Sequence, residues 1–596
     1  MSLPKRNEVP QAATWDLTRI YPTKNDWRQA LQENSQAISK LPALQQNLTK
    51  DGPAFYQTIK SVLAARRMME KVYVYASLMS DADTGNQENL ALVAQAQQNA
   101  NDFETAAAFL EPAILALSDE QLAQFKKEEP RLACYEHFLQ AIRAKKEHTL
   151  PVKEEELLAS ANGALQASEN TFNVLTNSDL SYPYVEDENG EMVQLSEGLY
   201  NVLIQSKKRT VRAGAFHALY QTIRQFENSL AATLSGTVKA HNFTAKAHHY
   251  PSARTQALAQ NLVPGKVYDT LLQEVNKHLD LLHRYVALRK RVLGIKELKM
   301  YDIYVPLVDQ DKEVYTLDRA KQEAKKALSC LGADYLKHVD YIFNNRVIDP
   351  VESKGKVTGA YSGGSYDTDP YELLNWENDL DSLFTLVHET GHSVHSMYSH
   401  EAQPYVYGEY PIFLAEIAST TNENILLNYL LDHTRDKQKR AFLLNYFLDS
   451  AKGTLYRQTQ FAEFEQFIHE QDQQGQPLTA NRLNDFYAQL NEKYYGSAIE
   501  TGSEIAMEWA RIPHFYYDFY VYQYATGFAA ATMLSDKILH GSDQDRAAYL
   551  GFLKAGCSSD PVSIMKKAGV AMDEPAYLEK TFKIFEQRLN ELEDLL

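Results

Sequence analysis

The most constraining feature of the chain is a helical repeat of apolar residues that continues over most of its length. In stretches such as "FYQTIKSVLAARRMMEKVYVYASLM" (residues 55–79), apolar side chains recur at intervals of three and four residues, the period of an amphipathic helix. Glycine (25) and proline (20) are sparse in 596 residues, so few positions would end such helices. We therefore predict a mainly α-helical protein, large enough to divide into more than one domain.

A predicted hairpin interrupts the helical pattern at "SYPYVEDENGEMVQLS" (residues 181–196), where two β-prone runs flank Asp187–Gly190. We expect a domain junction at this hairpin. It would divide the chain into an N-terminal helical region, residues 1–196, and a second region, residues 197–596.

Two further segments have β character. "MYDIYVPLV" (residues 300–308) and "GKVTGAYSGG" (residues 355–364) are predicted as strands or extended segments of a small sheet. The second lies shortly before a cluster of histidines, so we expect a minor β element next to that cluster. Such a strand could pair with an extended peptide through main-chain hydrogen bonds, with "GAYSGG" as a flexible loop.

Composition excludes several classes of protein. A formal net charge of -18 argues against a nucleic-acid partner, which would need a basic surface. The three cysteines, Cys134, Cys330 and Cys557, are dispersed, as is typical of free thiols in a reducing compartment. The N-terminus lacks the apolar core of a signal peptide, and no run approaches the roughly 18 apolar residues of a membrane span. We therefore predict a soluble, cytoplasmic protein.

The stretch "LVHETGHSVHSMYSH" (residues 386–400) contains a His-Glu-x-x-His motif. On a helix, His388 and His392 project from one face one turn apart, which lets two imidazoles bind one Zn²⁺. Glu389, beside the first histidine, is the expected general base. The motif lies in an apolar helix, where unpaired histidines and a glutamate would be costly. We therefore predict a metal site, with zinc inferred from the ligand types and Co²⁺ or Mn²⁺ able to occupy the same ligands.

The third ligand must come from elsewhere in the chain. The zinc-peptidase pattern with a third histidine is excluded, because His395 and Tyr398 occupy its glycine and final histidine positions. Glu401 and Glu409 lie in a connector broken by proline and glycine and are predicted to face solvent. Glu416 lies in an apolar helix, where a carboxylate needs a partner, so we predict Glu416 as the third ligand.

Two neighbouring residues keep alternative interpretations. Glu423 follows Glu416 by seven residues and either hydrogen-bonds the free N–H of a ligand imidazole or lies on the helix surface. His395 shares a face with His388, and a structural, hydrogen-bonded role is favoured over a ligand role.

A tyrosine-rich run, "PHFYYDFYVYQY" (residues 513–524), lies downstream. Pro513 suits the first turn of a helix, which would place His514, Tyr517 and Tyr524 on one face. Hydrogen-bond donors on that face could stabilise the oxyanion of a tetrahedral intermediate. The remaining aromatic residues weighed here are predicted to be core: Tyr516, Phe519 and Tyr520.

These motifs together resemble the zinc oligopeptidases of the thimet-oligopeptidase type, in particular their oligoendopeptidase F branch. The segments that carry the resemblance extend over nearly the whole chain: "TWDLTRIYPTKNDW", "SKGKVTGAYSGG", "HETGHSVH", "FLAEIAST" and "IPHFYYDFYVYQYATG". The resemblance implies a multi-helix, two-lobed shell that encloses a deep substrate channel, with the zinc at its base. It also implies endopeptidase action on short peptides.

Carried over by position, the resemblance implies a site of seven residues. His388, His392 and Glu416 would be the zinc ligands, and Glu389 would be the catalytic base. The residues that would bind substrate and stabilise the transition state are His514, Tyr517 and Tyr524.

Two other functions remain open from the sequence. A dipeptidyl carboxypeptidase on a similar helical scaffold would need a cationic side chain to hold the terminal carboxylate of its substrate. A non-catalytic, zinc-stabilised peptide-binding protein would not need Glu389. We therefore predict a zinc metalloendopeptidase.

Overall fold

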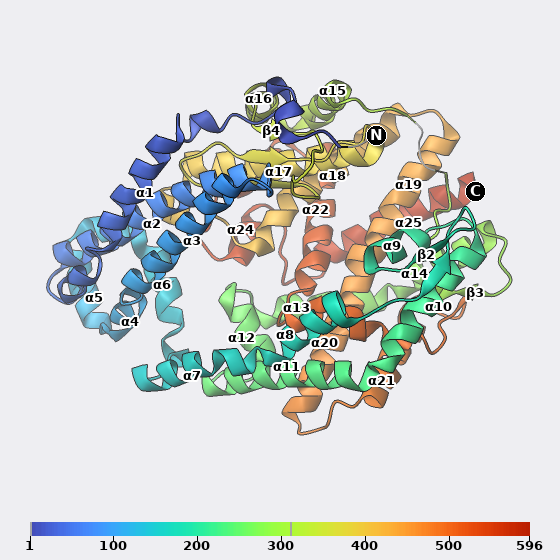
Figure 1. Ribbon diagram of the computed structural model, residues 1–596, viewed down its shortest axis with the longest axis horizontal. Coiled ribbons are helices and arrows are strands. Elements are labelled where there is room, and N and C mark those ends of the chain that lie inside the picture. Colours follow the sequence, from blue (N-terminus) through green and yellow to red (C-terminus); the bar gives the residue numbers. More distant parts are fainter. Residues whose placement is uncertain (1–2, 310–312) are drawn as a thin grey trace. The chain divides into compact units, whose positions relative to one another are not determined.

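The computed structural model describes residues 3–309 and 313–596, and it confirms a mainly α-helical protein with small β elements (Figure 1). The chain forms two compact units, each assembled from three separate segments of sequence. Unit 1 consists of Met1–Glu147, Lys312–Tyr429 and Leu534–Gly569, and unit 2 consists of His148–Asp311, Leu430–Met533 and Val570–Leu596. The predicted junction at residue 196 falls inside unit 2, and the division into two sequence domains there stays a prediction.

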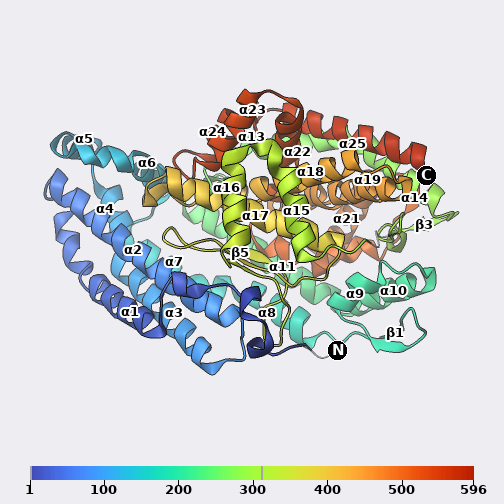
Figure 2. The same cartoon turned by 90° about the horizontal axis from the view of Figure 1, so that it is seen from above.

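Unit 1 begins with a bundle in which α1, α2 and α3 lie side by side (Figure 2). The helices that lie wholly in unit 1 are α1 (Lys24–Ile38), α2 (Gly52–Asp81), α3 (Gln87–Ala107), α4 (Leu110–Ala116), α5 (Asp119–Glu128), α6 (Glu136–Ala144), α15 (Leu317–Leu328), α16 (Ala333–Asn344), α17 (Leu380–Ala402), α23 (Asp543–Leu553) and α24 (Pro561–Lys567).

Unit 2 contains a second group of packed helices, in which α11, α20 and α21 lie against one another. Its helices are α7 (Val152–Leu165), α8 (Ala167–Val174), α9 (Glu197–Leu203), α10 (Arg209–Gln225), α11 (Glu227–Ala247), α12 (Ala253–Gln260), α13 (Gly265–Lys277), α14 (Leu279–Val292), α19 (Lys437–Ala451), α20 (Arg457–Gln473), α21 (Ala480–Tyr495) and α25 (Ala576–Leu595). Two further helices cross from one unit to the other: α18 (Ile412–His433) and α22 (Tyr522–His540).

The helices of the first bundle begin and pack as their sequence dictates. Thr23 caps α1 by accepting the backbone N–H of Asp26, and the Asp26 carboxylate in turn accepts the N–H of Thr23. Trp27 is fully buried and donates its indole N–H to the Val72 carbonyl oxygen of α2. A buried indole with a satisfied N–H both fills the core and fixes how the two helices face each other.

A three-stranded sheet lies directly before α17 in the sequence and belongs to unit 1. Its strands are β4 (Ile348–Asp349), β5 (Tyr361–Gly363) and β6 (Tyr371–Leu373), in the order β4-β6-β5. β6 pairs parallel to β4 and antiparallel to β5, with Ser362 opposite Glu372. The predicted β element next to the histidines is therefore present. The "GAYSGG" segment contributes the edge strand β5, where the sequence had indicated a loop.

The other two predicted β segments had different outcomes. The hairpin is present as β1 (Tyr184–Glu186) and β2 (Met192–Gln194), which pair antiparallel. The prediction of a strand at residues 300–308 is wrong, because β3 (Leu298–Lys299) ends before this segment. The buried Asp302 carboxylate accepts the Lys299 N–H and bends the chain into a 3₁₀ turn. β3 pairs instead with β7 (Ile499–Glu500).

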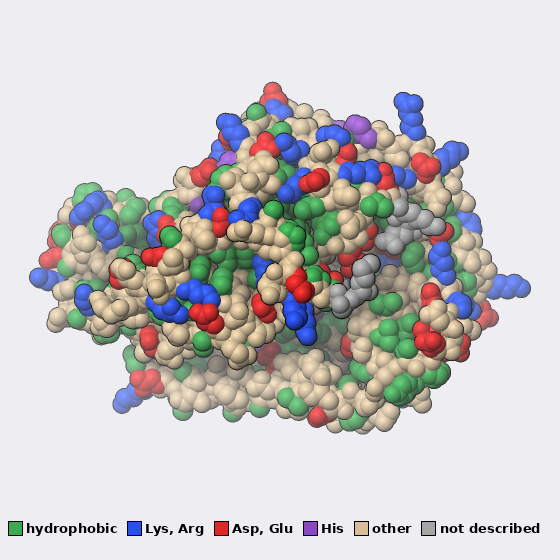
Figure 3. Space-filling view, turned by 45° about the horizontal axis from the view of Figure 1, so that its top comes forward, with side chains coloured by type: hydrophobic (Ala, Val, Ile, Leu, Met, Phe, Trp, Pro, Cys, Tyr) green, Lys and Arg blue, Asp and Glu red, His purple; other side chains and the backbone are tan. Residues whose placement is uncertain are grey.

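The surface carries both signs of charge. On the face drawn in Figure 3, acidic and basic side chains are interspersed, so the net charge of -18 does not gather into one acidic region there. Among residues 3–309 and 313–596, no helix has both the length and the apolar character needed to cross a membrane.

Candidate metal centre and aromatic loop

Helix α17 carries the His-Glu-x-x-His motif. Its first turn is capped and its inner face is apolar. The Asp379 carboxylate accepts the Ser382 N–H, which satisfies one of the free donors of the first turn. His388 and His392 then lie one turn apart on the same side of the helix. The fully buried residues of the inner face include Leu383, Leu386, Val387 and Val394.

Gly391 allows α18 to approach α17 closely. A Cβ atom at Gly391 would lie 2.7 Å from the Cα of Ser419, a separation that real Cβ atoms do not show. The amide of Asn422 also donates to the Val387 carbonyl oxygen of α17. Since Glu416 lies three residues before Ser419, this contact between backbones brings Glu416 opposite the two histidines.

The three predicted ligands lie together in unit 1, with their ligand atoms within 4.8 Å of one another. The Nε2 atoms of His388 and His392 are 3.2 Å apart, and Glu416 Oε2 lies 3.4 Å from the first and 3.8 Å from the second. Ligand atoms bound tetrahedrally to one Zn²⁺ are about 3.4 Å apart. The ring centroids are 4.8 Å apart and the imidazole planes meet at 79°, so the two nitrogens do not face each other along one line and both can bind the same ion. The donor set therefore fits one zinc ion.

Glu423 controls the orientation of one of these histidines. Its carboxylate accepts a hydrogen bond from His388 Nδ1, so Nδ1 carries a proton and Nε2 is the nitrogen that faces the ligand cluster. This is the arrangement found behind metal-binding histidines. Burial by itself would lower the pKa of His388, but its hydrogen bonds to Glu416 and Glu423 raise that pKa to about 10. The same two carboxylates would stabilise a divalent cation bound at His388 Nε2.

Glu389 lies beside the ligand cluster and is nearly fully buried, with 6% of its surface exposed. Burial raises the pKa of Glu389 to about 7, with the Glu416 carboxylate acting in the same direction and His388 opposing it. The backbone of Ser362, on the edge strand β5, acts against this rise in pKa. A carboxyl group held in this way can exchange a proton near neutral pH.

A second buried carboxyl group, Glu372 of β6, was not found from the sequence. Ser393 Oγ donates to Glu372 Oε1 over 2.8 Å, and the hydroxyl of Ser362 lies 2.8 Å from that of Ser393. Burial raises the pKa of Glu372 to about 8. The sequence signal that could have indicated this group is a lone glutamate in the apolar run "YELL". A glutamate buried in such a run needs a hydrogen-bond partner.

The other acidic and imidazole groups near the motif lie apart from the ligand cluster. As predicted, Glu401 and Glu409 face solvent, with 61% and 63% of their side chains exposed. Glu416 is less enclosed than expected, with 43% of its side chain exposed. His395 is buried and stacks on the Tyr410 ring, with the ring centroids 3.7 Å apart. This supports a structural role for His395 over a ligand role.

In unit 2, the tyrosine-rich run departs from the predicted helix. Pro513–Tyr516 forms a short 3₁₀ turn, and α22 begins only at Tyr522. Between them, Asp518 and Phe519 adopt left-handed backbone conformations, with φ of 47° and 56°. A right-handed helix cannot pass through such residues, so the prediction of one continuous helical face is wrong.

The loop between the two helical segments nevertheless brings the predicted aromatic donors together. The ring of His514 lies 5.5 Å from that of Tyr517 and 6.0 Å from that of Tyr524, measured between centroids. Tyr517 is exposed, with 47% of its surface accessible. Of the three aromatic residues predicted to be core, Tyr516 and Phe519 are buried and Tyr520 is half-buried. We call residues 513–521 the aromatic loop.

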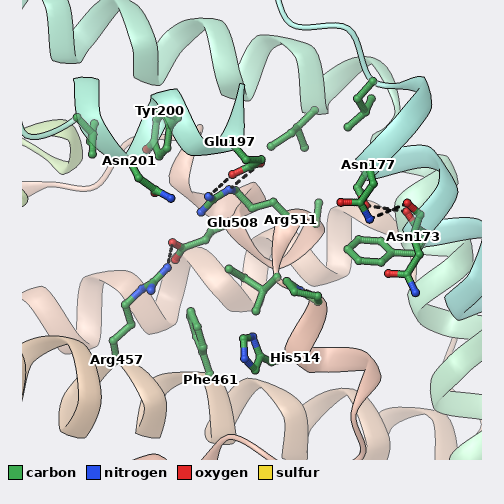
Figure 4. Close-up of a pocket in the computed structure, with 18 of the residues that line it drawn as sticks. Asn173, Asn177, Glu197, Tyr200, Asn201, Arg457, Phe461, Glu508, Arg511 and His514 are labelled. Carbon is green, nitrogen blue, oxygen red and sulfur yellow. Dashed lines mark hydrogen bonds and ion pairs between the residues drawn. The ribbon is translucent and has the colours of Figure 1, made fainter. Parts of the chain in front are cut away.

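A pocket of about 680 Å³ opens beside the aromatic loop, with His514 and Tyr517 among its lining residues (Figure 4). Two ion pairs form one wall: Arg457 with Glu508, and Arg511 with Glu197. Burial and the nearby Arg457 guanidinium lower the pKa of His514. Amide side chains also line the pocket: Asn173, Asn177 and Asn201. Each amide can both donate and accept a hydrogen bond, as each peptide unit of a substrate main chain can.

Comparison with known protein families gives two matches. The family described as peptidase family M3 matches residues 202–584, and the one described as Oligopeptidase F matches residues 114–182.

Full-length relatives agree with this assignment. The group B oligopeptidase PepB of Streptococcus agalactiae is 47% identical and covers 99% of this chain and 98% of its own length. Oligopeptidase PepF of Bacillus subtilis is 44% identical and covers 100% of this chain and 89% of its own. Plasmid-encoded oligoendopeptidase F of Lactococcus lactis subsp. cremoris is 48% identical, over 99% and 98% of the two chains.

A solved structure has the same fold. Oligoendopeptidase-F from Enterococcus faecium is 44% identical, with a TM-score of 0.73 over 96% of this chain and 99% of that chain. Its name matches those of the relatives found by sequence. The chain belongs to peptidase family M3, and its full-length relatives include proteins named oligoendopeptidase F.

Proposed function

We propose that this M3 peptidase is a zinc metalloendopeptidase that hydrolyses internal bonds of short peptides. The proposal rests on one observation above all: His388, His392 and Glu416 point three donor atoms at one position, with the buried Glu389 carboxyl beside them. A structural zinc site would have no use for that carboxyl. The names of the relatives, which include oligoendopeptidase, support internal cleavage over removal of terminal residues.

The proposed chemistry divides between the metal and the protein. A zinc ion held by these three residues would supply Lewis acidity, polarising a peptide carbonyl and lowering the pKa of water. The Glu389 carboxylate would take the proton from the attacking water and deliver it to the leaving amine. Glu423, through His388 Nδ1, would keep that imidazole in the tautomer that binds metal.

The remaining roles belong to peptide binding. We propose that the edge strand β5 offers main-chain groups to an extended peptide, as edge strands do in other peptide-binding proteins. We also propose that His514, Tyr517 and Tyr524 of unit 2 bind substrate and donate hydrogen bonds to the carbonyl oxygen as it gains charge. All three cysteines are free thiols, which supports the proposed cytoplasmic location.

The decisive variant is Glu389→Gln, which removes the base while keeping the shape of the side chain. We expect unchanged zinc content and a fall in kcat/KM of about 10²- to 10⁴-fold, measured on a peptide blocked at both ends. Glu409→Gln, an exposed glutamate in the same region, is the control and should cleave normally. Wild-type turnover by Glu389→Gln would contradict the mechanism, and an uncut blocked peptide with wild-type enzyme would contradict internal cleavage.

A further inference from the structure

Unit 2 contains a second cluster of potential metal ligands, which lies directly behind the aromatic loop. His241 of α11, His469 of α20 and Asp518 of the loop have ligand atoms within 4.8 Å of one another. His241 Nδ1 lies 3.1 Å from His469 Nε2 and 3.5 Å from Asp518 Oδ1. By distance alone, this cluster resembles the proposed zinc site.

The orientation of the rings shows a different interaction. The two imidazoles are coplanar to within 2°, and their centroids are 5.4 Å apart. With only 3.1 Å between the nitrogens, that centroid separation requires the two nitrogens to face each other along one line. Lone pairs on such a line cannot converge on a metal ion, whereas one proton between the nitrogens makes a good hydrogen bond.

The backbone settles which nitrogen carries the proton. His469 Nδ1 lies 2.8 Å from the Glu465 carbonyl oxygen, which can only accept. Nδ1 of His469 is therefore the donor, its Nε2 is the acceptor, and His241 Nδ1 donates to it. Burial lowers the pKa of His241 to about 3 and that of His469 to about 4, so both rings are neutral, as this chain of hydrogen bonds requires.

Glu465 joins this chain to the backbone of the aromatic loop. Its side chain is fully buried, and Oε1 accepts the Phe519 N–H over 2.6 Å. Phe519 and its neighbour Asp518 are the two left-handed residues of the loop, and neither is glycine. Such conformations are costly and persist only where surrounding contacts impose them. The Glu465 carboxyl is one such contact, and the packing of the Phe519 ring on the His469 ring, with centroids 4.6 Å apart, is another.

We propose that Glu465, together with the His469–His241 pair, positions the aromatic loop and thereby sets the place of the Tyr517 phenol. Tyr517 immediately precedes the strained pair and lines the pocket described above. This inference rests on the proposed role of Tyr517 in binding substrate. Glu465 acts as a positioning residue, because its carboxyl contacts the loop backbone behind the site.

Asp518 offers a second test of how the aromatic loop is positioned. Its Oδ1 atom is buried and accepts no hydrogen bond within the part of the chain that the structure describes, and burial raises the pKa of Asp518 to about 7. Asparagine keeps the shape of this side chain and tolerates left-handed backbone better than most residues, whereas alanine does not. Asp518→Asn should therefore keep the loop, and Asp518→Ala should release it.

The test compares a variant that removes the acceptor with one that preserves it. Glu465→Leu has no acceptor for the Phe519 N–H, whereas the side-chain carbonyl of Glu465→Gln still accepts it. On a fluorogenic peptide we expect Glu465→Leu to lower kcat at least about tenfold, with KM changed less. Glu465→Gln should stay within about threefold of wild type, and the zinc content of both should be unchanged.

The double variant Glu465→Leu/Tyr517→Phe separates positioning from general damage. If Glu465 acts through Tyr517, the two losses in kcat do not multiply, because the second change removes a group already misplaced by the first. Multiplicative losses, or equal losses in Glu465→Gln and Glu465→Leu, would overturn the positioning role. Full activity of Tyr517→Phe would also overturn it. That result would leave the role of Glu389 intact, so it can be told apart from a failure of the proposed function.

Should Glu465→Leu not fold, the pair Asp518→Asn and Asp518→Ala makes the same comparison, and equal kcat in the two would refute the proposal.

Discussion

The two histidine pairs of this protein have nearly equal separations and different chemistry. The facing nitrogens are 3.2 Å apart in His388–His392 and 3.1 Å apart in His241–His469. The ring centroids are 4.8 Å apart in the first pair and 5.4 Å apart in the second. The second pair is therefore aligned end to end, with the N–H of His241 directed at the Nε2 lone pair of His469, and the first pair is not aligned in this way. The direction of the lone pairs, more than the distance between nitrogens, therefore separates a metal-ligand set from a hydrogen bond.

The charged groups around the two histidine pairs also differ. Carboxylates lie on both sides of His388, with Glu416 at Nε2 and Glu423 at Nδ1, and they raise the pKa of this imidazole despite its burial. Behind His469 lies a neutral backbone carbonyl, and burial lowers the pKa of that imidazole. Asp518 is the carboxyl group of the second cluster, and burial raises its pKa to about 7. The first environment therefore attracts a cation more strongly than the second. We therefore expect one metal ion per chain, bound at the first pair.

The largest expected effect comes from removing the third ligand. Glu416→Ala deletes the only carboxylate among the three predicted ligands, and two imidazoles alone hold zinc weakly. We expect bound zinc, measured by elemental analysis after gel filtration, to fall from about one per chain to less than about a tenth. Peptide cleavage should fall with it.

Glu409→Ala is the matched control for this experiment. Glu409 is an exposed glutamate seven residues before Glu416, and its partner is His400. It should retain both zinc and activity. Full zinc content in Glu416→Ala would show that the third ligand had been misassigned.

A smaller effect is expected behind the first histidine. Glu423→Gln keeps an acceptor for His388 Nδ1 but removes the negative charge that strengthens the imidazole as a ligand. Changes of this kind typically weaken metal binding by about 10- to 100-fold. Competition with a zinc chelator measures the affinity directly. An unchanged affinity would show that the negative charge of Glu423 does not strengthen His388 as a ligand.

The sequence predicted which three side chains lie together at the candidate metal site, because that information is local. His388 and His392 follow from a four-residue spacing on a helix, and Glu416 follows from a carboxylate in an apolar segment. The structure brings all three together. Glu372 was missed because its hydrogen-bond partner Ser393 is 21 residues away. A lone glutamate in an apolar run does not reveal which residue will be its partner.

The aromatic loop was predicted poorly for a related reason. Residues 513–521 contain neither glycine nor asparagine, so the local sequence marks the left-handed turn only weakly, through Asp518. The turn depends on Glu465, which is 54 residues from Phe519. Aromatic residues at helical spacing therefore predicted a helix that a long-range hydrogen bond overrides. The prediction of a mainly α-helical protein is still correct, because many other segments show the helical period independently.

Gly391 offers a way to perturb the first pair without changing a ligand. In Gly391→Ala the new Cβ would press on the Ser419 backbone and move α18, which carries Glu416, away from α17. Overpacking of this kind costs about 1–3 kcal/mol of folding free energy, and we expect zinc affinity to fall roughly tenfold as the ligands separate. Thermal unfolding and chelator competition measure the two effects.

Gly214→Ala is the control for Gly391→Ala. Gly214 lies inside α10, and a Cβ atom there would meet nothing within 4 Å. Alanine should stabilise that helix by up to about 1 kcal/mol and leave zinc affinity unchanged. Equal behaviour of the two variants would show that close approach at Gly391 does not govern the metal site.

The last prediction concerns the second pair, His241–His469, where we expect a substitution to leave the metal content unchanged. His241→Phe removes the donor to His469 Nε2 and leaves that buried nitrogen without its partner, which costs about 1–3 kcal/mol of folding free energy. If the pair is a hydrogen bond, bound metal stays at one per chain in both wild type and variant, even after incubation with excess Zn²⁺ or Co²⁺. Two metal ions in the wild type and one in His241→Phe would make this cluster a ligand set, despite its coplanar rings. The Co²⁺ form adds a direct readout, because tetrahedral ligand sites absorb strongly in the visible range. Variants of His388, His392 or Glu416 should lose that absorption, and His241→Phe should keep it.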